Sequence, residues 1–202
     1  MTLGIIHSEV KALLARGSSM DAAIPGYVRR AGRWLEENYD LLHMRRLGEM
    51  TVLVDAQFVD APNSRVKNIE TVRLIEGDKR TNLVQVDLKE VNSYAAGTPE
   101  GYVLVNTNKI MLDCKCGTEL QFELFWNEFT EWPGDLDATN WIISSAEHLL
   151  ICQTLLMIGQ RTRDEKLVTA NKGLRDEALK VVLDSQENAK QANRNYVMKV
   201  RT

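Results

Sequence analysis

The sequence predicts an α+β protein in which a β region is inserted between two pairs of helices. Apolar residues recur at helical spacing near both ends of the chain, and they alternate with a period of two between about residues 50 and 126. The alternating runs are short and closely spaced, which favours hairpins over crossover connections. We therefore expect a bundle of about four helices, with an antiparallel β insert between helices 2 and 3 and an extended C-terminal tail.

Two helices are expected before the β region. The first covers about residues 3–16 and the second about residues 20–42, each with one apolar face. Pro25 belongs in the first turn of the second helix, where its missing backbone N–H removes no hydrogen bond. The apolar faces consist of Leu3, Ile6, Val10, Leu13 and Leu14 in the first helix, and of Ile24, Val28, Ala31, Leu35 and Leu42 in the second.

Two further helices are expected after the β insert. One covers about residues 139–160 and should be the central helix, because its near side is almost wholly apolar. The other covers about residues 163–195 and outlasts its core, since its apolar stripe thins to small and polar residues from Ser185 onward. The inward residues that we predict for this last helix are Leu167, Ala170, Leu174, Ala178 and Val181.

Composition excludes several classes of protein. The chain has 202 residues, of which 44% are hydrophobic and 26% charged, so it is neither disordered nor fibrous by composition. No apolar stretch approaches the ~20 residues of a membrane span, and no basic segment precedes an apolar one at the start, so we expect neither membrane association nor secretion. Three cysteines, two of them only two residues apart, favour a reducing compartment. One core is expected, and two small subdomains remain possible.

The net charge of -3 is unevenly distributed. Residues 188–202 contain four basic and no acidic residues, so this segment carries +4 and the rest of the chain -7. A basic, apolar tail beside a mostly acidic body is typical of a segment that binds a partner.

A search for catalytic motifs finds none. Phosphate-binding loops, the serine nucleophile elbow and the H-E-x-x-H zinc pattern are all missing, so we assign no catalytic residue, no metal ligand and no cofactor. His7 and His43 lie near helix ends, where a surface imidazole is expected. A zinc site is an alternative, but its spacing is not that of known zinc modules; its four ligands would be Cys114, Cys116, His148 and Cys152.

A run of acidic residues interleaved with aromatic ones lies between residues 119 and 137. Paired carboxylates beside aromatic rings are typical of glycan hydrolases. Around Glu123, however, acids alternate with apolar residues as they do on a half-exposed strand, and we favour that interpretation. The acidic residues are Glu119, Glu123, Glu128, Glu131, Asp135 and Asp137.

An arginine cluster raises the possibility of DNA binding. Its members are Arg29, Arg30, Arg33, Arg45 and Arg46. Acidic residues intervene and no aromatic stacking pattern accompanies the arginines, so a solvated helix face is the favoured interpretation.

The layout as a whole resembles the head-to-tail adaptor proteins of tailed bacteriophages, also called connector, head-completion or tail accessory proteins. The resemblance covers roughly residues 3–196 and depends on the order of short motifs after two N-terminal helices. These motifs are Gly97-Thr98-Pro99, Leu124-Phe125-Trp126, Asp135-Leu136 and Thr139-Asn140, followed by two helices and a tail. Many relatives carry a proline-rich turn after the strand that Ile110-Met111-Leu112 matches, whereas this chain has residues 113–117 without proline.

The resemblance implies a non-enzymatic structural protein of the virion with residues 1–187 as a single adaptor domain. Such a protein would bind the portal as a ring of twelve copies, extend the DNA channel and provide the docking surface for the nozzle or tube of the tail. It would assemble in the host cytoplasm, remain at the head–tail junction, and let duplex DNA pass during ejection. Some relatives have been credited with peptidoglycan hydrolysis, so a muramidase-like glycan hydrolase is the alternative.

The tail of residues 188–202 is the predicted contact with the portal or with a neighbouring subunit. A helix that outlasts its core, followed by an apolar segment, requires another chain to cover it. We expect apolar residues of the tail to pack on that partner and basic ones to face its acidic groups. The interface residues are Lys190, Arg194, Tyr196, Val197, Met198, Lys199, Val200 and Arg201. Free protein is expected to be monomeric until it meets its template.

Overall fold

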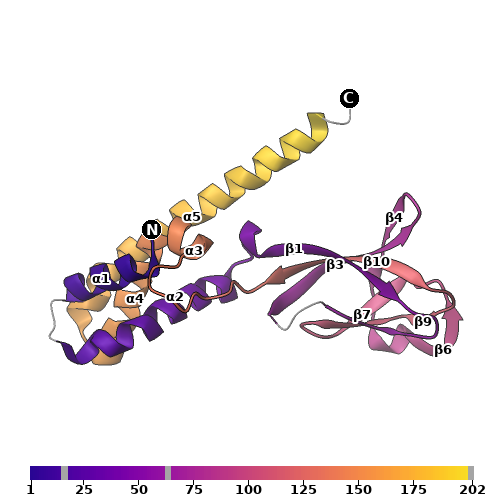
Figure 1. Cartoon of the computed structure of the whole chain (residues 1–202), viewed down its shortest axis with the longest axis horizontal. Coiled ribbons are helices and arrows are strands. Elements are labelled where there is room, and N and C mark those ends of the chain that lie inside the picture. The colour runs from indigo at the N-terminus through magenta and orange to yellow at the C-terminus, as the bar shows by residue number, and fades with distance from the viewer. Residues whose placement is uncertain (15–17, 62–64, 200–202) are drawn as a thin grey trace. The chain divides into compact units, whose positions relative to one another are not determined.

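The computed structural model describes residues 1–14, 18–61 and 65–199, without the side chains of residues 18, 19 and 192–199. Helices and antiparallel sheet occur together, which confirms the α+β class (Figure 1). The chain forms two compact units: a helical unit of Met1–His43 and Thr130–Thr202, and a sheet unit of Met44–Phe129. The sequence had left two subdomains possible. That the two units act as one adaptor domain stays a prediction.

The helical unit begins with α1 and α2, close to where the sequence places them. α2 begins later than predicted, because a short 3-10 helix leads directly into it, and it ends where Tyr39 adopts an extended conformation. Pro25 lies in its first turn, as predicted. The elements are α1 (Leu3–Leu14), η1 (Ser18–Ala23), α2 (Ile24–Asn38) and η2 (Leu42–Met44).

The predicted central helix is interrupted. It consists of α3 (Trp141–Ser145) and α4 (Glu147–Thr162), which meet at Ala146 in a non-helical conformation. Near this break, the Ser144 hydroxyl donates to the backbone carbonyls of Asn140 and Trp141, and such bonds are associated with bent helices. α4 is nevertheless the most buried helix of its unit, as its apolar composition predicts.

The last helix, α5 (Glu165–Lys199), is longer than predicted. We predicted an extended segment from residue 196, but the helix continues to Lys199. No proline or glycine follows Gly173, and adding residues to an existing helix costs little compared with starting one. Residues 200–202 lie outside the described part of the chain.

The predicted inward face of α5 is partly wrong. Ala178 is buried as expected, but Ala170, Leu174 and Val181 are exposed. The buried face of α5 contains Asn171, Ala178, Val182 and Gln186, about a quarter-turn away around the helix. The side-chain amides of Asn171 and Gln186 are buried at the two ends of this face. An apolar pattern cannot identify buried amides, and this explains why the predicted face was wrong.

In the described residues, the sheet unit contains two four-stranded sheets and one two-stranded sheet. β10 is an inner strand of the first four-stranded sheet. β10 pairs antiparallel with both β1 and β3. The strands are β1 (Arg45–Val52), β2 (Phe58–Asp60), β3 (Val66–Glu76), β4 (Lys79–Asn82), β5 (Val84–Gln85), β6 (Asn92–Gly97), β7 (Gly101–Asn106), β8 (Lys109–Leu112), β9 (Cys114–Cys116) and β10 (Leu120–Glu128), and η3 (Leu88–Glu90) follows β5. The sheet orders are β1-β10-β3-β4, β2-β8-β7-β5 and β6-β9.

The core of the sheet unit uses the alternation that the sequence predicts. Val72, Phe122 and Leu124 are fully buried, and so are Ile110 and Leu112 of the second sheet. The pairs β5–β7 and β6–β9 are parallel, however, so the β region is not wholly antiparallel. Both parallel pairs are short, and the β6–β9 pair is irregular in register. The positions of turn residues predict antiparallel hairpins and therefore do not predict these parallel pairs.

Candidate functional site

The acidic residues of the hydrolase alternative divide between the two units. Glu123 and Glu128 belong to β10 of the sheet unit, whereas Glu131, Asp135 and Asp137 belong to the connection that enters the helical unit. A glycan hydrolase needs two carboxyl groups directed at one bond. Asp137 lines a surface pocket beside α1 that contains none of the other acids of this group.

The two acids on β10 are bound by arginines. Glu123 accepts from Arg73, with Nη1 and Oε2 3.1 Å apart, and Arg80 Nε lies 3.4 Å from its other oxygen. Glu128 Oε1 lies 2.8 Å from Arg65 Nη2. Both carboxylates are more than nine-tenths buried, so these pairs stabilise the strands and occupy the oxygens that a catalyst would direct at a substrate.

The four residues of the zinc alternative also divide between the units. Cys114 and Cys116 lie on β9 of the sheet unit, whereas His148 and Cys152 lie on α4, with Nε2 and Sγ 3.7 Å apart. Burial raises the pKa of all three thiols, and Asp113 contributes to the rise at Cys114. Metal ligation requires thiolates, which such a rise disfavours. Among the described residues, no group of three or more potential ligands occurs.

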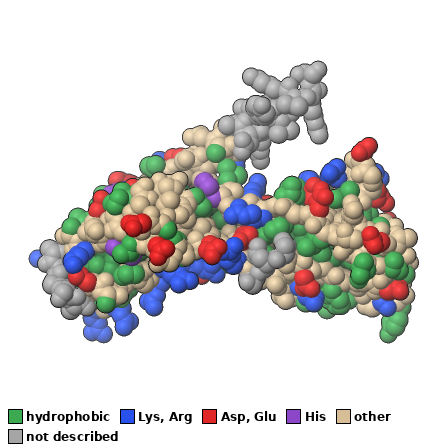
Figure 2. All heavy atoms as spheres, in the orientation of Figure 1, with side chains coloured by type: hydrophobic (Ala, Val, Ile, Leu, Met, Phe, Trp, Pro, Cys, Tyr) green, Lys and Arg blue, Asp and Glu red, His purple; other side chains and the backbone are tan. Residues whose placement is uncertain are grey.

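The arginine cluster is divided as well. Arg29, Arg30 and Arg33 are exposed on α2, and Figure 2 shows Lys and Arg side chains along the lower edge of the helical unit. Arg30 lies over the Tyr27 ring, 5.7 Å from its centre, and Arg33 pairs with Glu37. These contacts are those of a solvated helix face.

The other two arginines of the cluster, Arg45 and Arg46, lie on β1 in the sheet unit, where they face Glu70 and Glu128. Only three of the five arginines therefore lie on the helix that the DNA-binding alternative would use.

The two remaining histidines, His7 and His43, take part in the packing of the helical unit. His43 stacks on Trp141 with ring centres 4.2 Å apart, and its Nδ1 lies 3.4 Å from Gln186 Nε2. His7 lies on α1, where burial lowers its pKa.

The predicted interface lies mostly beyond the side chains that the structure describes. Lys190 is described, and its Nζ lies 4.0 Å from Glu187 of the preceding turn. The backbone from Arg194 to Lys199 is helical, while Val200 and Arg201 lie outside the described residues. Their contacts therefore stay a prediction.

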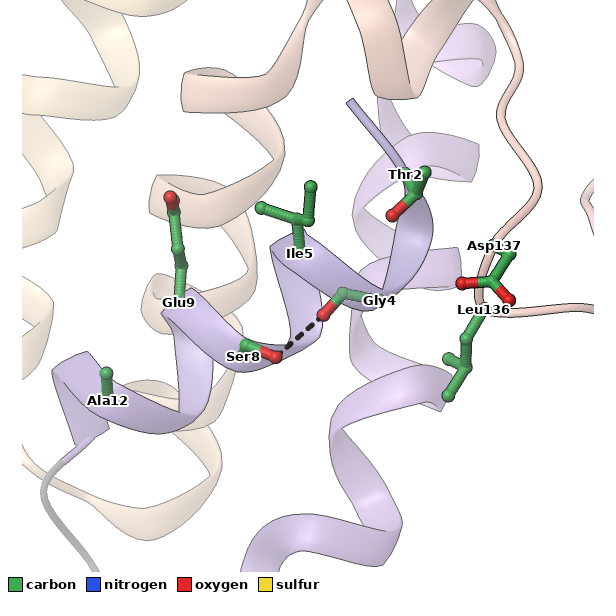
Figure 3. A pocket seen from close by; sticks show the side chains of 8 residues that line it. All are labelled: Thr2, Gly4, Ile5, Ser8, Glu9, Ala12, Leu136 and Asp137. Atoms are coloured by element: carbon green, nitrogen blue, oxygen red, sulfur yellow. Dashed lines mark hydrogen bonds between the residues drawn. The ribbon is translucent and has the colours of Figure 1, made fainter.

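One surface feature was not predicted from the sequence, and we call it the α1 groove. It has a volume of about 550 Å³ and lies between α1 and the connection before α3 (Figure 3). Its principal residues are Gly4, Ile5, Ser8, Glu9, Ala12, Leu136 and Asp137. The spacing of Gly4, Ser8 and Ala12 by four residues was the available signal, but small residues contribute little to an apolar pattern.

Backbone hydrogen bonds build the α1 groove. The first free N–H groups of α1 donate to the connection: Leu3 N to Ala138 O at 3.1 Å and Gly4 N to Leu136 O at 2.7 Å. A Cβ atom at Gly4 would lie 3.2 Å from that same oxygen, so glycine permits the close approach. The connection thus accepts the hydrogen bonds of the free N–H groups at the start of α1, and it places Leu136 beside that helix.

Comparison with known proteins identifies no family. No protein-family model and no curated protein matches the chain. Among solved structures, the chain is similar to a protein of the neck of an empty GTA particle, computed with C6 symmetry. The two share 18% sequence identity over 75% of this chain and 78% of the other, with a TM-score of 0.26. A likeness this distant carries no argument about fold or function. In the described part of the chain, no helix combines the length and apolarity needed to cross a membrane.

Proposed function

We propose that this chain is a structural virion protein, a head-to-tail adaptor of a tailed bacteriophage. The motif order of the sequence suggests the family, and the observation that carries the proposal is α5. This helix has 35 residues, but among its described side chains the last buried one is Gln186, and none of residues 187–191 is buried. A helix that continues past its own core is suited to contact with another chain.

In the virion, the adaptor would bind the portal as a ring of twelve copies and extend the DNA channel. Its far side would provide the docking surface for the nozzle or tube of the tail. The negative charge of residues 1–187 would let duplex DNA slide through during ejection. Assembly would take place in the host cytoplasm.

We also propose that the protein is not an enzyme. The arginine contacts of Glu123 and Glu128 support this, because a muramidase-like hydrolase would need a carboxyl pair free to face the glycan. Purified protein should leave peptidoglycan intact in a turbidity assay. Lysis that Glu123→Gln or Glu128→Gln abolishes would support the hydrolase instead.

Electron microscopy of the protein mixed with purified portal tests the adaptor role. An added ring on one face of the portal is the expected result, and portal without added density at saturating protein would contradict it. Deletion of residues 188–202 should abolish the added ring. The matched control is Lys172→Glu, a charge change at an exposed residue of α5 before the projecting turns, which should leave assembly unchanged.

A further inference from the structure

We infer that the α1 groove receives residues 187–199, the distal turns of α5, from a second copy of this chain. The inference rests on the proposed function and makes it more specific. A closed ring requires a head-to-tail contact, in which two different surfaces of one copy meet their counterparts on the next. The α1 groove and the distal turns are two such surfaces, both on the helical unit.

The described side chains of the distal turns, residues 187–191, are not buried in their own unit. Among the described side chains of α5, the last buried one is Gln186, whose Oε1 accepts from Leu42 N at 3.0 Å. Beyond it, α5 runs on past the other helices of its unit (Figure 1). The distal turns are about 20 Å long, and α1 is about 18 Å long, so one can lie along the other over its whole length.

The shape of the α1 groove suits a helix. Gly4, Ser8 and Ala12 form a row of small residues on the outward side of α1, opposite its buried face. Small side chains let a second helix approach closely. Ile5 and Leu136, which are 44% and 54% exposed, lie on different sides of this row and offer apolar contact (Figure 3). An occupant with a mixed apolar and small surface would cover both.

Charge identifies the occupant. Glu9 and Asp137 are exposed and line the groove, and no ion pair involves them within the described residues. After Glu187, the distal turns contain only basic charges, Lys190, Arg194 and Lys199, together with the apolar residues 196–198. Opposite charges of this kind orient an interface and exclude like-charged partners.

A charge exchange between the two surfaces tests the contact. The groove variant carries Glu9→Lys and Asp137→Lys, and the tail variant carries Arg194→Glu and Lys199→Glu. All four positions lie on the surface or at the projecting end, and circular dichroism would verify that each variant is folded. The measurement is the protein concentration that gives half-maximal ring assembly on purified portal, followed by sedimentation.

Each variant alone should raise that concentration about tenfold, and the two combined in one chain should return it to within about threefold of the wild type. Lys172→Glu with Lys180→Glu, exposed charges of α5 before Gln186, is the control and should have no effect. Wild-type assembly by the groove variant overturns the inference. So does a defect in the tail variant that the combined chain does not repair, which would assign the distal turns to the portal.

Failure of the adaptor role is a separate outcome. If the wild type forms no ring on portal, sedimentation of the same four proteins without portal, at high concentration, decides the inference. Self-association that each variant weakens and the combined chain recovers supports the contact without the adaptor role. A chain that does not self-associate in either assay overturns both.

Discussion

The two units bury polar side chains in different ways, and the sheet unit does so by pairing opposite charges. Glu123 is buried on the central strand β10 and contacts arginines from β3 and β4. The Arg73 guanidinium also lies over the Phe125 ring, 4.5 Å from its centre. These pairs join residues of three neighbouring strands, so they stabilise the register of the sheet from within the unit.

The helical unit instead uses buried polar side chains to bind backbone groups of the chain's own connections. Glu36 is buried on α2, and its Oε1 accepts from Thr130 N at 2.7 Å. Gln186 on α5 accepts from Leu42 N. These are the points where the chain leaves the helical unit and re-enters it.

The difference shows that each unit is stabilised by its own contacts, while the ends of both connections are fixed by the helical unit.

The largest expected effect comes from breaking the charge pairs of the sheet unit. Replacement of both Arg73 and Arg80 by alanine leaves Glu123 as an unpaired buried charge, which should lower the free energy of unfolding by about 3 kcal/mol. Urea denaturation measures the change. Adding Glu123→Gln should recover part of the loss, because an amide carries no charge to leave unpaired. A double variant as stable as the wild type would refute the role of these pairs.

The next effect concerns the packing of the segment after Thr130, where the chain re-enters the helical unit. A Cβ atom at Gly32 would clash with the Trp132 ring, so Gly32→Ala should destabilise by about 2 kcal/mol through overpacking. Gly26→Ala is the matched control, since no atom lies within 4 Å of its added Cβ in the same helix. Thermal unfolding followed by helical circular dichroism should separate the two variants, and equal melting temperatures would contradict the packing argument.

Removal of the Glu36 carboxylate should have a smaller effect. Glu36→Ala leaves Thr130 N without its acceptor, at an expected cost of about 1–2 kcal/mol. Hydrogen exchange of the Thr130 amide should accelerate in this variant, whereas Glu36→Gln, which keeps an acceptor oxygen, should protect the amide nearly as well as the wild type. Unchanged protection in Glu36→Ala would show that the connection is held by other contacts.

The sequence predicted the elements better than their faces. Periodicity located the helices and the β region to within a few residues, because alternation and helical spacing report directly on the burial of apolar side chains. It failed on α5, where the buried face includes the amides of Asn171 and Gln186 while Leu174 and Val181 remain exposed. It failed also at Ala146, because side-chain hydrogen bonds such as those of Ser144, which are associated with bent helices, do not alter the apolar pattern.

The candidate surfaces were predictable in part. The charge of residues 188–202 predicts a contact segment at the C-terminal end of α5 from composition alone, and its contacts stay a prediction. The α1 groove was not predictable, because it depends on a backbone contact between Gly4 and Leu136, more than a hundred residues apart. Composition and spacing do not reveal such a long-range contact.

The smallest expected effect is a change of stability with pH. It arises from His7 in the helical unit, whereas the buried acids of the sheet unit are paired with arginines. Burial of His7 lowers its pKa below the model-peptide value of 6.5, so the unfolded chain takes up a proton before the folded one. Stability should therefore fall as the pH drops below about 6.5, until the folded imidazole is protonated as well.

The His7→Gln variant isolates this effect, because carboxylates titrate alike in both proteins. The melting temperature of the wild type should decline more between pH 7.5 and 5.5 than that of His7→Gln. Parallel pH profiles for wild type and His7→Gln would mean that the α1 imidazole is solvated. In that case the contrast between the units would rest on their carboxylates and amides alone.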